Sequence, residues 1–260
     1  MNAQSFRLDW AAMTDRGSVR EQNEDAFVAL PEVGVWIVAD GMGGFKRGEW
    51  ASELITGMFD GLEPQTDLAQ LLNASTQAVH FANQTIFAKS QELGAQIGST
   101  VVGLAIVGDE FGVFWAGDSR AYLLRGGVFY QVTRDHTQVQ ELVERGRIGA
   151  DEAATHPMSH VLSKAVGVQQ DLELEGVTET VASGDLFLLC SDGLHGVLGD
   201  DEICELITAG SIEQSPDRLI RRCLERGAKD NVTAIVVQAM PPTILVFGST
   251  AKHPSGDMHP

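Results

Sequence analysis

Acidic residues stand at the ends of several apolar stretches of this 260-residue sequence. Asp40 ends VWIVAD, Asp118 ends VFWAGD, Asp192 ends LFLLCSD, and Asp230 comes just before NVTAIVV. An Asp-Gly pair after a strand is ordinary turn chemistry, so each acid taken alone is most simply a turn residue. Four such acids beside apolar strands are not explained in this way. Because strands of a sandwich start and end at shared edges, we expect these carboxylates to converge at one rim.

Carboxylates gathered in a partly dry site repel one another strongly, and a bound divalent cation reverses the sign of that interaction. Ligands that are all oxygen select Mg²⁺, Mn²⁺ or Ca²⁺ over zinc or copper. Upstream, Arg20 is followed by Glu24 and Asp25, a run that by itself is a solvated charged segment. Beside a metal site, the guanidinium fork of Arg20 suits two phosphate oxygens. The pattern therefore indicates phosphoryl chemistry.

Other phosphate and metal chemistries fail the sequence test. The glycines at positions 41–48 match neither GxxxxGK[ST] nor GxGxxG. Cys190, Cys204 and Cys223 lack an arginine six residues later, the spacing that a thiol phosphatase needs. Cys190 lies inside an apolar stretch and is expected to be a buried structural thiol. No two histidines have the spacing of a zinc site.

Composition excludes several classes of partner. The chain has 18 Lys and Arg against 36 Asp and Glu, a net charge of −18, which disfavours binding to nucleic acid or to an anionic membrane surface. No segment approaches the roughly 18 apolar residues that span a bilayer, and the first residues lack the pattern of a signal peptide. The three cysteines, an odd number, fit a reducing compartment. We expect a cytoplasmic protein.

Apolar stretches of strand length must position the acids. They are rich in Val, Ile, Phe and Trp and bounded by Gly, Asp and Ser. These stretches lie at residues 8–13, 33–39, 100–107, 111–116, 121–124, 186–190 and 232–237. Short connections that contain glycine, GDE at 108–110 and RGG at 125–127, predict hairpins and therefore antiparallel pairing.

Helical patterns lie outside these strands. One begins near Gly48, and a longer one has Thr66 as its expected N-cap. Two more cover residues 200–208 and 215–226, the latter with Pro216 in its first turn. Strands without intervening helices and helices in pairs predict an α+β fold, with a central antiparallel β-sandwich flanked by helix pairs on both faces.

The pattern predicts one domain over residues 1–240. Residues 135–167 lack strand signals and are expected to form a surface insertion. Residues 241–260 open with two prolines and are expected to be a poorly ordered tail, in which TILVF could pair as a short strand.

Eight segments then carry a resemblance to a known family. In chain order they are RGSVREQNEDAF, VADGMGG, GSTVVGLAI, WAGDSRAYLLRGG, VTRDHT, VLSKAVG, LLCSDGL and DNVTAIVV. With this ordered set, nearly all of residues 8–238 resembles the metal-dependent protein phosphatases of the PP2C type (PPM family) in their compact bacterial form. One segment alone would be a weak signal, whereas eight in order are highly specific. The resemblance implies a central antiparallel β-sandwich flanked by helices, in agreement with the strand and helix patterns.

The resemblance also assigns roles to single residues. Asp40 would bridge two divalent metal ions, Mn²⁺ or Mg²⁺, and Asp192 and Asp230 would complete the ligands of the first. Gly41 would add its backbone carbonyl to the second ion. Glu24 sits where the family often has a carboxylate near that ion, although many bacterial members carry Gln there.

Further residues take supporting or substrate-binding roles by the same resemblance. Asp118 and Asp192 match the pair that holds a third, weaker ion in bacterial relatives. Arg20 would grip the substrate phosphate. Asp25 and Asn231 would support the metal ligands from behind.

One departure concerns Met42. Some members, notably eukaryotic ones, have a histidine two residues after the bridging aspartate, proposed to protonate the leaving oxygen. Met42 cannot donate a proton, so any acid catalysis must come from metal-bound water. The expected reaction is in-line attack on phosphorus by a hydroxide that bridges two cations about 4 Å apart, without a covalent enzyme intermediate.

The resemblance implies substrates that are proteins bearing phosphoserine or phosphothreonine, with a bacterial Ser/Thr kinase as the opponent. Residues 135–167 would form a flap that tunes substrate choice. We expect a monomer that binds neither nucleic acid nor membrane. Two alternatives stay open: a catalytically inactive interaction module of the same fold, and a metal-dependent hydrolase of small phosphoesters. The intact set of acids argues against the first, and comparing phosphopeptide with sugar phosphate rates would decide the second.

Overall fold

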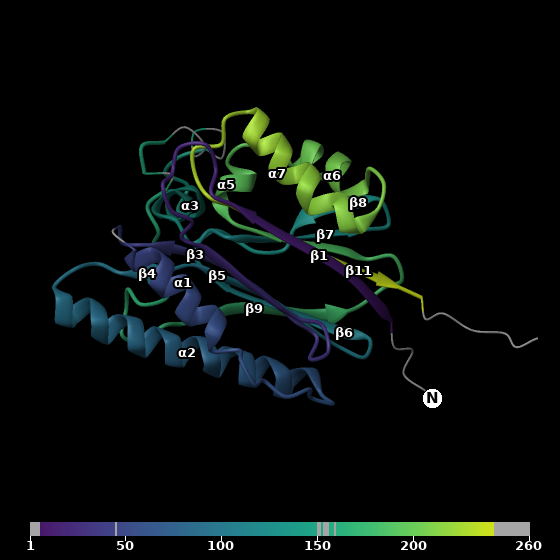
Figure 1. Ribbon diagram of the computed structural model, residues 1–260, viewed down its shortest axis with the longest axis horizontal. Helices are drawn as coiled ribbons and strands as arrows, with labels where there is room; N and C mark the ends of the chain where they lie inside the picture. Colours follow the sequence, from purple (N-terminus) through teal and green to yellow (C-terminus); the bar gives the residue numbers. More distant parts are fainter. Residues whose placement is uncertain (1–5, 45, 150–151, 153–155, 159, 242–260) are drawn as a thin grey trace, which may run out of the picture.

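Two antiparallel β-sheets face each other and are covered by helices on both outer sides (Figure 1). The computed structural model describes residues 6–44, 46–149, 152, 156–158 and 160–241. The resulting four layers, helix, sheet, sheet and helix, confirm the predicted α+β class with a central antiparallel sandwich.

The first sheet joins the N-terminal strand to the last strand of the domain. Its strands, in spatial order, are β1 (Arg7–Asp15), β11 (Val232–Met240), β10 (Leu186–Cys190), β7 (Arg120–Arg125) and β8 (Val128–Gln131). All neighbouring pairs are antiparallel. The hairpin predicted from RGG joins β7 to β8, and Gly126 and Gly127 in its turn have φ of 57° and 82°. Glycine adopts such positive φ values without steric cost.

The second sheet contains the other apolar strands. Its strands, in spatial order, are β2 (Asp25–Leu30), β3 (Val35–Met42), β5 (Val101–Val107), β6 (Glu110–Ala116) and β9 (Glu175–Thr180). The short strand β4 (Gly98–Ser99) pairs with the end of β3. The predicted GDE hairpin joins β5 to β6. Strands β2 and β9 lay outside the predicted set, and β9 escaped because its sequence EGVTET is polar and largely exposed at the sheet edge.

Three apolar layers hold the sheets and helices together. Trp36, Phe111 and Phe187 are buried between the two sheets. Helices α1 (Arg47–Gly57) and α2 (Leu68–Leu93) cover the second sheet. Helices α6 (Asp200–Thr208) and α7 (Ser215–Glu225) cover the first. Burial on both faces of both sheets fixes how the strand ends of one sheet lie against those of the other.

The helices follow the predicted positions with one correction. Thr66 is not the N-cap of α2, because Asp67 directly precedes the first helical residue and its side chain accepts a hydrogen bond from the Gln70 amide at 3.1 Å. An aspartate in extended geometry satisfies an otherwise free amide of the first turn. Helix α7 has Pro216 in its first turn, as predicted.

The described part of residues 135–167 contains the helix α3 (Gln138–Glu144) and isolated bridges instead of a paired strand. Both ends of this segment are fastened to the sandwich. Arg120 donates to both carboxylate oxygens of Asp135, with the closest contact at 2.7 Å. At the other end, the Val166 amide donates to the Ser99 carbonyl at 2.8 Å. The segment therefore begins and ends beside the same end of the sheets.

Two expectations about compartment can be compared with the fold. In the part of the chain that the structure covers, none of the helices combines the length and apolar character needed to cross a membrane. Cys190 and Cys223 are buried and all three cysteines are free thiols. Burial raises the pKa of the Cys190 thiol, as expected for an inert structural cysteine.

Of the expected tail, residues 242–260, including TILVF, lie outside the described residues.

Candidate active site

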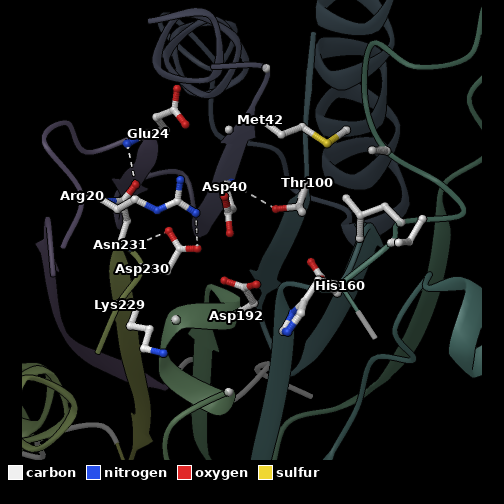
Figure 2. Close-up of a pocket in the computed structure, with 18 of the residues that line it drawn as sticks. Arg20, Glu24, Asp40, Met42, Thr100, His160, Asp192, Lys229, Asp230 and Asn231 are labelled. Carbon is white, nitrogen blue, oxygen red and sulfur yellow. Dashed lines mark hydrogen bonds and ion pairs between the residues drawn. The ribbon is translucent and has the colours of Figure 1, made fainter. Parts of the chain in front are cut away.

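A cavity of about 1340 Å³ opens at the end of the sandwich where β3, β6 and β10 finish and β5 and β11 begin (Figure 2). Strand ends of both sheets therefore contribute to its walls. Eight of the nine residues expected at the site line it, namely Arg20, Glu24, Asp40, Gly41, Asp118, Asp192, Asp230 and Asn231. The ninth, Asp25, is buried behind this wall. The structure brings together acids that the sequence only placed beside separate strands.

Backbone contacts on both sides hold Asp40 at the cavity floor. Its amide donates to Thr100 Oγ1 at 3.0 Å, and its carbonyl accepts from the Thr100 amide at 2.8 Å. The same carbonyl accepts from Ser99 Oγ at 2.9 Å. Strand β2 pairs on the opposite edge, with Asp25 facing Asp40 in the register. The backbone of Asp40 is thus fixed by strands, and its carboxylate is free to face the cavity.

Asp192 and Asp230 approach from the first sheet. Asp192 begins the short helix α5 (Asp192–His195) directly after β10, and Asp230 lies just before β11. Glycine at position 193 permits this approach, because a Cβ there would lie 1.9 Å from the Asn231 carbonyl oxygen. The two acids are therefore held side by side by close backbone packing of neighbouring strand ends.

Asn231 ties the loop that carries Arg20 and Glu24 to this wall. Its Oδ1 accepts from the Glu24 amide at 2.8 Å. Its Nδ2 donates to the carbonyl oxygens of Arg16 and Gln22, both at 2.9 Å. The side chain is 4% exposed, so these bonds are made away from water. One amide thereby satisfies three backbone groups of a loop more than 200 residues away.

Asp25 supports the acids of the first sheet from below. Its Oδ2 accepts from Ser191 Oγ at 2.7 Å and from Thr233 Oγ1 at 2.6 Å. Its other carboxylate oxygen is buried without a hydrogen-bond partner. Burial raises the pKa of Asp25 to about 7, although the two hydroxyl donors oppose this shift. Because this oxygen has no donor, the hydrogen bonds around Asp25 do not fully compensate the negative charge of its carboxylate.

The carboxylates of the cavity destabilise one another's charged forms. Burial, followed by the charges of Asp25 and Asp192, raises the pKa of Asp40 well above its usual range. Burial and the charge of Asp192 raise the pKa of Asp118 to about 8. The pKa of Asp192 is raised by burial and by Asp230. Such crowding of buried carboxylates is characteristic of functional sites and would be relieved by cations.

Arg20 provides the principal positive charge beside these acids. Its Nη2 lies 2.7 Å from Asp230 Oδ2, and both side chains are about half exposed. The hydrogen bond to Asp230 raises the pKa of the Arg20 guanidinium. Burial raises the pKa of nearby Glu24, and the charge of Arg20 opposes this rise.

Close packing of glycines brings Glu24 next to the Gly41 carbonyl. A Cβ at Gly48 would lie 2.7 Å from both Glu24 Oε1 and the Gly41 carbonyl oxygen. A Cβ at Gly41 would in turn meet the Gly48 carbonyl oxygen at 2.1 Å. Glu24 Oε1 and the Gly41 carbonyl oxygen, which are expected to bind the same metal ion, therefore both lie close to Gly48. Any residue with a Cβ at position 48 would collide with them.

The donor set fits hard divalent cations. It consists of carboxylates and a backbone carbonyl, the ligands that Mg²⁺ and Mn²⁺ prefer. The side chains do not form a closed cage: within the described ranges, no three His, Cys, Asp or Glu side chains are grouped to hold an ion. Instead, Asp230 pairs with Arg20. The guanidinium thus offsets part of the charge that cations would neutralise.

Several residues that line the cavity or support its wall were not predicted as part of the site. Thr100 holds the Asp40 amide, and its polar position inside an apolar stretch was an available signal. His195 Nε2 lies 2.9 Å from the Asp118 carbonyl and orients that turn. Burial lowers the pKa of His195 to about 4, so the ring is neutral. His160 and Lys229 also line the cavity, and no motif distinguished them along the chain. Met42 lines it as well, as expected from its position.

Comparison with known sequences agrees with this geometry. The family model for protein phosphatase 2C matches residues 11–232. The serine/threonine protein phosphatase PstP of Mycobacterium tuberculosis is 36% identical over 236 residues, which cover 90% of this chain and 45% of PstP. The chain therefore spans about half the length of that relative. The serine/threonine phosphatase stp of Listeria innocua is 30% identical over 236 residues, covering 86% of this chain and 93% of the relative.

Solved structures show the same architecture. PppA, a regulatory component of the type VI secretion system in Pseudomonas aeruginosa, superposes with a TM-score of 0.84 at 38% identity, over 90% of this chain and 98% of PppA. The catalytic domain of PstP in complex with two manganese ions superposes with a TM-score of 0.80 at 36% identity, over 90% of this chain and 98% of that domain.

Proposed function

This chain belongs to the protein phosphatase 2C family, and we propose that it hydrolyses phosphoserine and phosphothreonine in proteins with the aid of two divalent cations. The observation that carries the proposal is the convergence of five carboxylates from both sheets, together with Arg20, on one cavity. The relatives named as serine/threonine phosphatases support the substrate class. The two manganese ions in the PstP structure support the cofactor.

We propose the ligands from the family match together with the residues that line the cavity. Asp40, Asp192 and Asp230 would hold one ion, and Asp40 would share a second ion with Glu24 and the Gly41 carbonyl. The adjacent Asp118 and Asp192 would hold a third, weaker ion. Bound divalent ions supply a water acidified toward neutrality and a Lewis acid for the phosphoryl oxygens.

The protein's own groups would bind and orient the substrate. Arg20 is placed to donate two hydrogen bonds to the phosphate once it leaves Asp230, a geometry that the planar guanidinium favours. Thr100 holds the backbone of Asp40 in place, and Asn231 holds the loop that carries Arg20 and Glu24. Among the described lining residues there is no cysteine, which supports direct hydrolysis without a thiol intermediate. At Met42 the cavity presents a thioether, which cannot protonate a leaving group.

The surrounding segments and partners belong to the same proposal. We infer that residues 135–167 act as a flap, because residues 160–162, 164 and 165 line one wall of the cavity. The expected opponent is a Ser/Thr kinase. Free thiols at all three cysteines support a cytoplasmic location. The one-domain boundary near residue 240, the monomeric state and the poorly ordered tail stay predictions.

Phosphate release from a phosphothreonine peptide tests this function directly. We expect turnover with Mn²⁺ or Mg²⁺, none with EDTA, and slower hydrolysis of sugar phosphates than of peptides. No release from any phosphate ester with Mn²⁺ would favour the inactive interaction module. Faster hydrolysis of sugar phosphates would favour a hydrolase of small phosphoesters.

A further inference from the structure

We propose that Lys229 forms a binding subsite for a second anionic group of the substrate, next to the residue that carries the scissile phosphate. The inference rests on the proposed phosphatase function and deepens it. Lys229 lines the cavity and immediately precedes Asp230 in the chain. In Figure 2 its side chain extends beside Asp230 with the ammonium nitrogen directed away from that carboxylate.

The positive charges of the cavity are almost all occupied. Arg20 pairs with Asp230 at 2.7 Å, Lys164 with Glu175 at 3.4 Å, and Arg226 with Glu202 at 2.8 Å. Lys229 is the remaining Lys or Arg of the lining, and it has no ion pair or hydrogen bond within the part of the chain that the structure describes.

The carboxylate that follows Lys229 in the chain already has a cationic partner. Asp230 takes its hydrogen bond from Arg20. Lys229 therefore keeps an ammonium available for an anion that comes from outside the protein.

The backbone around Lys229 is held rigidly on both sides. The Ala228 carbonyl accepts from the Ser18 amide at 2.9 Å, and the Ala228 amide donates to the Cys223 carbonyl at 2.9 Å. On the other side, a Cβ at Gly17 would lie 2.1 Å from the Asp230 carbonyl oxygen, so these backbones are in close contact. Because this backbone is already fixed, only side-chain entropy is lost when the ammonium pairs with a substrate group.

The size of the cavity determines what that group can be. Its volume of about 1340 Å³ exceeds the range of about 300–1,000 Å³ typical of sites for small molecules. A phosphorylated residue and its neighbours in a peptide can therefore enter together. The second anion is then a carboxylate or a phosphate on a side chain adjacent to the phosphorylated residue. Both share the chemistry that a lysine ammonium recognises.

The test uses the whole chain with saturating Mn²⁺ and three phosphothreonine peptides that differ only in the two flanking residues. The flanks are glutamates, glutamines or phosphoserines, and the readout is kcat/KM for removal of the phosphothreonine phosphate. For the wild type we expect a ratio of about five between glutamate and glutamine flanks, the size of an exposed ion pair. The difference should lie in KM and shrink as salt is raised.

Variants separate a subsite from a general electrostatic effect. Lys229→Gln should bring the ratio close to one, Lys229→Glu should invert it, and Lys229→Arg should retain it. The matched control Lys89→Gln, which removes an exposed lysine on α2, should keep the wild-type ratio. A larger ratio for phosphoserine flanks would identify phosphate as the better anion, and a larger one for glutamate would identify carboxylate.

Two results would overturn the subsite and leave the proposed function standing. One is a wild type that hydrolyses all peptides at the same rate, and the other is a Lys229→Gln variant that loses activity equally on glutamate and glutamine flanks. A wild type that hydrolyses p-nitrophenyl phosphate but no peptide would instead overturn the substrate class, and the subsite with it. Hydrolysis of the glutamine-flanked peptide therefore tests the proposed function. The ratio of kcat/KM between glutamate and glutamine flanks tests the role of Lys229.

Discussion

The Arg20 guanidinium and the Asp230 carboxylate lie 2.7 Å apart although 210 residues separate them in the chain. One of the pair is the expected phosphate-binding group, and the other is an expected metal ligand. A cation that takes Asp230 would therefore release Arg20 toward the substrate. In the proposed function, metal binding and phosphate binding would therefore be linked through this ion pair.

Replacing Arg20 tests that linkage. Because a hydrogen bond to a charged group contributes about 1.5–3 kcal/mol, Arg20→Ala should lower kcat/KM for a phosphopeptide by about 10- to 100-fold. Arg20→Lys should retain part of the activity, since it keeps the charge without the bidentate fork. Calorimetric titration should show Mn²⁺ affinity no weaker than in the wild type, because Asp230 loses its competing partner. A large loss of Mn²⁺ affinity in Arg20→Ala would contradict the linkage.

Asp192→Asn should separate catalysis from folding. Loss of a shared ligand should reduce turnover by about a thousandfold or more, since metal ions supply several kcal/mol of transition-state stabilisation. The metal-free variant should melt at the same temperature as the wild type or higher, because a buried carboxylate beside Asp230 and Asp40 is removed. Thermal melting with and without Mn²⁺ checks both points.

The surface variant Asp217→Asn serves as the control for Asp192→Asn. It removes a carboxylate that pairs with Arg221 on the exposed side of α7. Turnover and the rise in melting temperature on adding Mn²⁺ should stay at wild-type values. Near-normal turnover in Asp192→Asn would refute the site.

Gly48→Ala should weaken one metal ion selectively. The new Cβ would lie 2.7 Å from Glu24 Oε1 and from the Gly41 carbonyl oxygen, so one of the two must move. We expect the affinity for one Mn²⁺ of two to fall by about 10-fold or more, the usual cost of disturbing a ligand's surroundings. Gly57→Ala in the same helix meets no atom within 4 Å and should instead stabilise the fold by up to about 1 kcal/mol. Equal effects of the two substitutions on Mn²⁺ binding would count against the assignment.

His136 should make stability depend on pH below neutrality. The ring is buried, its Nδ1 accepts from the Gly117 amide at 3.1 Å, and its Nε2 faces Glu175 at 3.0 Å. Burial lowers the pKa of His136 in the fold, with Lys164 and Arg134 acting in the same direction and Glu175 opposing them. Its stabilising effect is therefore present above about pH 6.5, the unfolded value, and is lost as the pH falls through the lower folded value.

Urea unfolding at pH 7.5 and pH 5.5 measures this effect. His136→Gln, which cannot be protonated, should be less stable than the wild type at pH 7.5 and should lose less stability on acidification. His80→Gln on α2 should keep the wild-type difference between the two pH values. An unchanged pH dependence in His136→Gln would show that another group controls it.

Much of the fold could be predicted because its determinants are local. Runs of Val, Ile, Phe and Trp mark the central strands, and the glycines of RGG mark the β7–β8 turn. The polar edge strand β9 could not be predicted in this way, because its position depends on pairing with β6. The cap of α2 was displaced by one residue, from Thr66 to Asp67, since both residue types can cap a helix.

The sequence by itself determined which residue types stand beside which strands, including the four aspartates, Arg20 and the unusual Met42. Only the tertiary structure decided that Asn231 holds the Glu24 loop, that Arg20 pairs with Asp230, and that Lys229 has no ion pair with any residue that the structure describes. The physical reason is the distance along the chain over which each kind of interaction acts. Strand and turn preferences act over a few residues, whereas contacts between groups 200 residues apart exist only once apolar burial has stacked the two sheets and aligned their ends.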